Sequence, residues 1–75
     1  MSKLPILTAH KLAKIFLKNG FLLKRSTGSH HTFYNPATKK IITIPMHRGH
    51  DLGRGITRAI IRDAGYTEAE FLDLL

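Results

Sequence analysis

The segment Lys24-Arg25-Ser26-Thr27-Gly28-Ser29-His30-His31 continues through Phe33-Tyr34 to Ile41-Ile42-Thr43-Ile44-Pro45-Met46-His47, and it decides the fold. β-Branched and aromatic residues recur along it, and the Thr27-Gly28 and Asn35-Pro36 pairs interrupt it. This pattern is typical of short strands joined by turns. It predicts three strands, over residues 21–26, 29–34 and 40–44, arranged as an antiparallel meander.

Alternation along these strands predicts which side chains share a face of the sheet. One face carries the apolar residues that we expect to point towards helices: Phe21, Leu23, Phe33, Ile42 and Ile44. The other face carries Leu22, Lys24, His30, Thr32, Tyr34 and Thr43. A shift of one residue in the phase of a strand would exchange the two faces.

Amphipathic helices flank the predicted strands. Over residues 8–19, Thr8 is a suitable N-cap, apolar residues recur at helical spacing, and Gly20 follows. The polar side of this helix carries a lysine stripe, namely Lys11, Lys14 and Lys18.

A second helix is predicted over residues 54–64, with an apolar stripe of Ile56, Ala59, Ile60 and Ala64 and with Arg54, Arg58 and Arg62 opposite. Thr67 and Glu70 have the spacing of a capping box, which predicts a short third helix. The expected fold is α+β: helix, three-stranded antiparallel sheet, helix and short helix, with the helices on one face and residues 1–75 in one domain.

The charge distribution predicts a polyanionic partner. The chain of 75 residues has a formal net charge of +7, and all five acidic residues follow residue 50. Such asymmetry is typical of nucleic-acid binding, although an anionic membrane or an acidic protein fits the charge equally well. Cysteine is absent, and no apolar run is long enough for a membrane span or a signal peptide, so we expect a cytoplasmic protein.

The chain has five histidines, which suggest two chemical roles: metal binding and general acid–base catalysis. A metal site is poorly supported, because His30 and His31 would point to opposite faces of a strand, and His47 with His50 offers few ligands. General acid–base chemistry suits histidine better, and Lys24, Arg25 and His47 could gather around His30. The alternative is that His30 is simply a polar residue near a turn. No full phosphate-loop motif is present, so no nucleotide cofactor is implied.

The residues also resemble a known family. Gly20-Phe21, Arg25, Gly28-Ser29-His30-His31, Ile44-Pro45-x-His47 and Gly55-x-x-Arg58-x-Ile60-x-x-x-Ala64-Gly65 are similar to the HicA toxins, over about residues 12–71. The turn between the second and third strands departs from the family pattern, because Ala37-Thr38-Lys39 replaces the family's Asp-Gly.

The resemblance implies a double-stranded-RNA-binding-domain-like fold, α-β-β-β-α, and a toxin that cleaves mRNA without a metal or cofactor. It also implies a HicB-like antitoxin that covers the active site in a toxin–antitoxin hetero-oligomer. The histidine of Gly-Ser-His, which is His30, would be the catalytic one. We expect Lys24, Arg25, Ser29 and His47 to contact the RNA.

Two other functions use the same residues. A non-catalytic RNA-binding module would bind RNA through the same basic surface in a salt-sensitive manner and leave it intact. A protein-interaction domain would use its basic face to bind an acidic partner and would have little affinity for RNA at physiological salt.

Overall fold

The computed structural model describes residues 4–47 and 51–75. The elements follow the predicted order: α1 (Ala9–Lys18), β2 (Leu22–Thr27), β3 (His30–Asn35), β4 (Lys40–Pro45), α2 (Arg54–Asp63) and α3 (Glu68–Leu72). Two short strands, β1 (Leu7–Thr8) and β5 (Asp51–Leu52), pair with each other. The α+β class, the three-stranded sheet and the short C-terminal helix are therefore confirmed.

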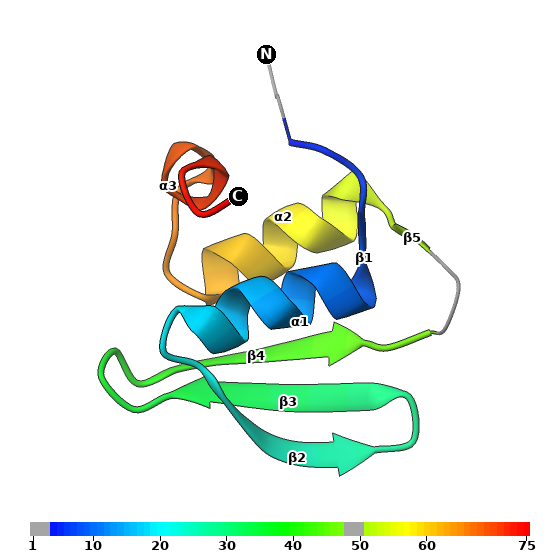
Figure 1. The fold of residues 1–75 in the computed structure, drawn as a ribbon. Helices are drawn as coiled ribbons and strands as arrows, with labels where there is room; N and C mark the ends of the chain where they lie inside the picture. The colour runs from blue at the N-terminus through cyan, green and yellow to red at the C-terminus, as the bar shows by residue number, and fades with distance from the viewer. Residues whose placement is uncertain (1–3, 48–50) are drawn as a thin grey trace.

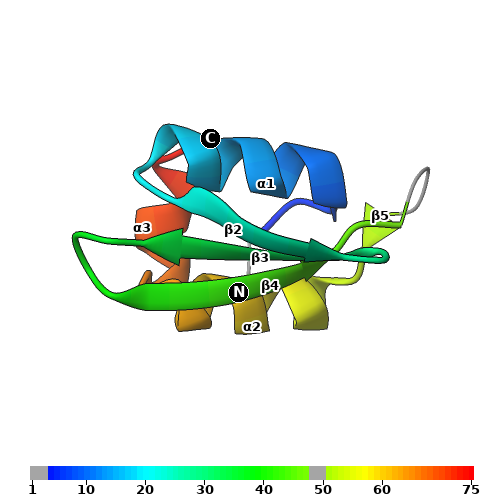
Figure 2. The ribbon, with the colours of Figure 1, turned by 90° about the horizontal axis from the view of Figure 1, so that it is seen from below.

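The sheet has the strand order β2-β3-β4, with antiparallel pairing throughout. Helices α1 and α2 lie side by side on one face of it, and no described element covers the other face (Figures 1 and 2). We call these the covered face and the open face. Among the described residues, the helices therefore bury only one of the two faces of the sheet.

Helix α1 begins and ends where the sequence predicts. The Thr8 hydroxyl accepts a hydrogen bond from the Lys11 N–H at 3.2 Å, which satisfies a donor in the first turn. Gly20 follows the helix with φ +94°, a left-handed value that glycine adopts without strain. The buried residues of the helix have the spacing of one helical face: Ala9, Leu12, Ala13 and Phe16.

Phe16 is the centre of an aromatic cluster that joins three parts of the chain. Its ring centroid lies 5.2 Å from that of Phe21, 5.8 Å from that of Phe71 and 6.1 Å from that of Tyr66. Phe21 precedes β2, and Phe71 belongs to α3, so the cluster fixes the short helix against α1 (Figure 1). The Thr67–Glu70 capping box that begins α3 is also present, as predicted.

The predicted strand phase is confirmed. Phe33 pairs with Ile42 and His31 with Ile44, and Phe33 and both isoleucines are buried beneath the helices. The sequence places Leu23 on this face as well, and it does pair with Phe33. Its side chain is nevertheless 52% exposed, because β2 is an edge strand on which neither helix packs closely.

The predicted apolar stripe of α2 is partly wrong. Ile56 is 50% exposed, whereas Thr57 is fully buried beside Ile60 and Ile61. The Thr57 hydroxyl donates to the carbonyl oxygen of Gly53 at 3.1 Å, so its burial leaves no unpaired polar atom. This local bond allows the helix to turn a threonine rather than an isoleucine towards the core.

The segment before α2 was predicted as a loop, and part of it forms β5. Leu52 pairs with Leu7 of β1, and both side chains are buried. The Arg54 guanidinium donates to the carbonyl oxygen of Leu4 at 2.8 Å, so the start of α2 is joined to the start of the described chain. Residues 48–50 of the predicted loop lie outside the described residues.

No helix in the described part of the chain is long and apolar enough to cross a membrane.

Candidate active site

The candidate active site lies at one end of the open face, where the β2–β3 hairpin meets the end of β4. The hairpin loop consists of Gly28 and Ser29, and Gly28 has φ +56°. A side chain at such a φ is strained, so glycine permits the tight turn that begins β3 at His30. The turn between β2 and β3 therefore positions the candidate catalytic histidine.

His30 and His47 lie next to each other in the structure. Their ring centroids are 6.5 Å apart, with the ring planes 77° from parallel, and both side chains are exposed. His30 pairs across the sheet with Pro45, and His47 follows two residues later. No hydrogen bond joins either imidazole to another residue in the part of the chain that the structure describes.

A main-chain hydrogen bond holds the segment that carries His47. The Met46 N–H donates to the carbonyl oxygen of Ser29, so the chain after β4 remains attached to the β2–β3 loop. Pro45 has no N–H of its own, and Met46 supplies the next donor along the strand. Ser29 thus contributes to the site through its backbone, which its sequence position did not predict.

A β-bulge in β2 places two consecutive cations on the open face. The register shifts between Leu23, which pairs with Phe33, and Arg25, which pairs with Thr32. The Lys24 Nζ lies 5.7 Å from the centroid of the Tyr34 ring, on the open face. Because cross-strand partners share a face, Arg25 lies on that face with Thr32, whereas regular alternation would have separated it from Lys24.

The candidate residues form a track along the sheet rather than one cluster. His30 and His47 are together at its end, and Arg25 lies opposite Thr32, two positions along β3 from His30. Lys24 lies over Tyr34, about 13 Å along the strand from His30 at 3.3 Å per residue. Such a track suits an extended, negatively charged chain better than a small compact ligand.

No described group of three or more His, Cys, Asp or Glu side chains has the arrangement of a metal site. The acidic residues in the described chain all belong to β5, α2, α3 or the chain end. One of them, Glu68, lies 3.7 Å from the Arg58 guanidinium. The strands of the sheet therefore carry cations and imidazoles and no carboxylate.

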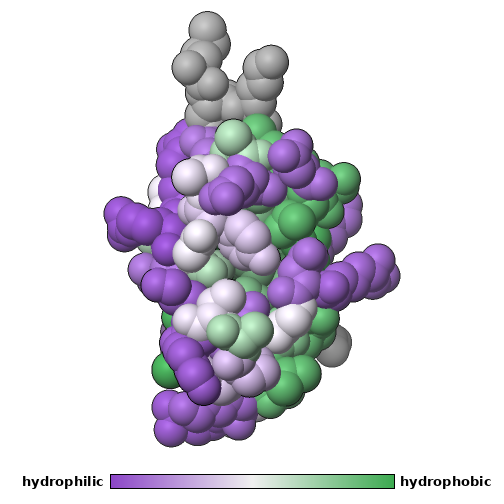
Figure 3. Space-filling view, turned by 90° about the vertical axis from the view of Figure 1, so that its left-hand side faces the viewer, coloured by the Kyte–Doolittle hydropathy of each residue, from purple (hydrophilic) through white to green (hydrophobic). Residues whose placement is uncertain are grey.

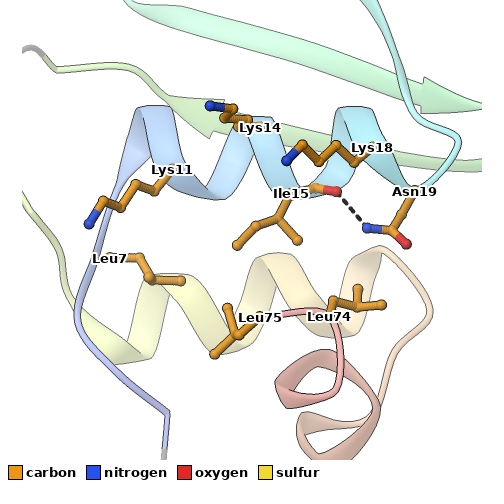
Figure 4. A pocket seen from close by; sticks show the side chains of 8 residues that line it. All are labelled: Leu7, Lys11, Lys14, Ile15, Lys18, Asn19, Leu74 and Leu75. Carbon is orange, nitrogen blue, oxygen red and sulfur yellow. Dashed lines mark hydrogen bonds between the residues drawn. The ribbon is translucent and has the colours of Figure 1, made fainter.

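Two of the grooves in the described part of the chain lie on the helix side of the molecule, and neither is lined by His30 or His47. One, of about 340 Å³, has an apolar floor of Leu7, Ile15, Leu74 and Leu75, and the lysine stripe of α1 forms its rim (Figure 4). The other, of about 390 Å³, lies between α1 and the covered face of β2 and β3, and includes His31. The side chains of His30 and His47 lie outside both grooves and are exposed.

Figure 3 shows the end of the molecule that includes α3 and the β3–β4 connection. Strongly hydrophilic side chains project from several places on this end, residues of intermediate hydropathy lie between them, and hydrophobic surface gathers along one side. The β3–β4 connection itself is organised by Asn35, whose side-chain oxygen accepts hydrogen bonds from the N–H groups of Ala37 and Thr38. This Asx turn serves the fold and contributes no candidate site residue.

The fold and the site define a small basic α+β protein with an exposed histidine pair at one end of the open face of its sheet. A family model described as "HicA toxin of bacterial toxin-antitoxin" matches residues 9–66. The chain therefore belongs to the HicA toxin family, as the sequence motifs predicted, and this membership implies a cognate antitoxin. No match was found among curated proteins.

Proposed function

We propose that the chain is a toxin endoribonuclease that cleaves mRNA, with His30 as a general acid or base. The observation that supports this most directly is the position of His30, which is exposed beside a second imidazole on a basic sheet face. Membership of the HicA toxin family supports the same function.

The proposed reaction is an intramolecular transesterification. A base removes the proton of the ribose 2′-hydroxyl, the 2′-oxygen forms a bond to phosphorus, and the bond from phosphorus to the 5′-oxygen breaks. An acid protonates that departing oxygen, which leaves a 2′,3′-cyclic phosphate and a 5′-hydroxyl. Histidine performs either proton transfer near neutral pH, and adjacent cations stabilise the charge on the phosphate. No step of this mechanism is routed through a metal ion.

The remaining candidates are proposed to bind RNA. Lys24 and Arg25 supply cations on the open face, and arginine suits phosphate because its planar donors match two phosphate oxygens. Ser29 and His47 lie at the hairpin end beside His30, where a phosphate under attack would lie. A cognate antitoxin that covered this face would block the reaction by excluding RNA.

The test is cleavage of an end-labelled RNA by the purified protein in the presence of EDTA. The wild type should cleave the RNA, and His30→Ala should be slower by at least about 100-fold, a typical contribution of acid–base catalysis. His31→Ala is the matched control, because it removes the neighbouring imidazole from the covered face. Circular dichroism should show that each variant is folded.

Two outcomes would contradict the proposal. Full activity in folded His30→Ala would show that this histidine is not catalytic. RNA that the wild type binds and leaves intact would instead support a non-catalytic RNA-binding module.

A further inference from the structure

We propose that His47 is a second catalytic residue, which performs the proton transfer that His30 does not. The inference rests on the proposed ribonuclease function and extends it from one acid–base group to two. The structural observation is the separation of 6.5 Å between the two ring centroids, on a surface that is open to an RNA chain.

The reaction requires two proton transfers at different oxygens. The attacking 2′-oxygen and the departing 5′-oxygen lie roughly in line on opposite sides of the phosphorus. An acid and a base must therefore each reach a different apical oxygen, within about 2.6–3.2 Å. Two imidazoles that flank one phosphodiester satisfy this requirement, whereas one imidazole cannot reach both oxygens at once.

The observed separation suits such a bridging phosphate. The rings are not hydrogen-bonded to each other, and neither ring bonds to another described side chain. A phosphodiester between them would be contacted from both sides without displacing any described interaction. The two rings have an edge-to-face arrangement, with their planes 77° from parallel.

The backbone places the two histidine residues beside each other independently of their imidazoles. His30 begins β3, and His47 follows the Met46 N–H that is bonded to the Ser29 carbonyl oxygen. His47 is exposed and contributes nothing to the buried core. Its replacement should therefore leave the fold and the position of His30 unchanged.

A modified substrate separates acid from base. In an RNA with sulfur in place of the bridging 5′-oxygen, the leaving thiolate needs no proton, because a thiol with a pKa of about 8.5 is far more acidic than an alcohol. Loss of the general acid should not slow cleavage of this RNA, whereas loss of the general base should. We expect His30→Ala and His47→Ala each to slow cleavage of normal RNA by at least about 100-fold.

The sulfur substrate should restore near-wild-type cleavage in one of these two variants and not in the other. The pH dependence supplies a second readout. The wild type should show a bell-shaped profile, and each single variant should lose one of its two limbs. Two further variants separate proton transfer from binding: His47→Gln retains a hydrogen-bond donor and acceptor, and His47→Arg retains a positive charge. Both should be as slow as His47→Ala.

Several results would overturn the proposal. These are cleavage by His47→Ala within a few-fold of the wild-type rate, full recovery in His47→Arg, or the same response of both alanine variants to the sulfur substrate. Failure of the ribonuclease function itself would look different, because the wild type would then leave normal RNA intact or His30→Ala would cleave it at the full rate.

Discussion

The ammonium of Lys24 lies over the ring of Tyr34, 5.7 Å from its centroid, on the open face of the sheet. The bulge between Leu23 and Arg25 makes this contact compatible with an Arg25 side chain on the same face. An exposed contact of this kind contributes about 0.5–1 kcal/mol. Its main consequence is that a flexible lysine is restrained beside the track that leads to His30.

The first prediction concerns these two cations. In a His30→Ala background, which should prevent cleavage, Lys24→Gln and Arg25→Gln should each weaken RNA binding. Each should also reduce the slope of log K against log salt concentration by about 0.7–0.9, because one phosphate contact is lost. The measurement is a salt titration of RNA affinity by fluorescence anisotropy.

Lys18→Gln is the matched control for this prediction, since it makes the same charge change on the groove of the helix side. It should change the slope much less than Lys24→Gln and Arg25→Gln do. Equal slopes for all three variants would show that RNA responds to net charge and not to the open face.

The second prediction compares two glycines. Gly20 has φ +94°, and a Cβ there would lie 3.4 Å from the side-chain nitrogen of Asn35, which is itself buried. Gly20→Ala should lower the free energy of unfolding by about 1–2 kcal/mol, the cost of a left-handed conformation for a residue with a Cβ. Gly55→Ala should instead raise it by about 0.5–1 kcal/mol, because Gly55 lies in α2 with open space around it. Urea denaturation measures both, and shifts of the same sign would contradict the assignment.

The third prediction concerns pH. The Thr67 N–H donates to a Glu70 carboxylate oxygen at 2.7 Å, and this bond, with a smaller contribution from the Thr67 side chain, lowers the pKa of Glu70 below its ordinary value of 4.5. A lowered pKa in the folded state means that the ionised carboxylate stabilises the fold. That stabilisation is complete above pH 4.5 and is lost as the pH falls through the lower folded-state pKa.

Glu70→Gln should therefore be less stable than the wild type at neutral pH, and the difference should disappear in acid. Chemical denaturation at a series of pH values measures it. Asp63→Asn is the control, because it removes an exposed carboxyl group outside the capping box. A difference between Glu70→Gln and the wild type that stays constant with pH would exclude the carboxylate as its source.

Local signals made most of the fold predictable from the sequence. The Thr8 cap, the Gly20 and Gly65 termini and the Thr67 capping box fixed the helices to within about a residue. The alternation of apolar residues fixed which face of each strand is covered. The order of elements followed because each of these signals depends on residues close together in the chain.

Features that depend on distant residues were not predictable. The exposure of Ile56 depends on which side of α2 packs against β4. The pairing of Leu7 with Leu52 joins two segments that are far apart in the chain. The bulge at Lys24 has no proline or glycine to mark it. At the site, motifs predicted His30 and His47 as members, but their adjacency depends on the hydrogen bond from Met46, which follows β4, to Ser29 in the β2–β3 loop.

Because the helices pack on only one face of the sheet, the two faces differ in how freely their side chains can be replaced. The buried core lies on the covered side of the sheet, whereas His30, His47, Lys24 and Arg25 are exposed on the open face. Exposed side chains of this kind contribute little to stability, so the replacement of one of them should leave the fold intact. The open face can therefore change its side chains while the core and the fold stay the same.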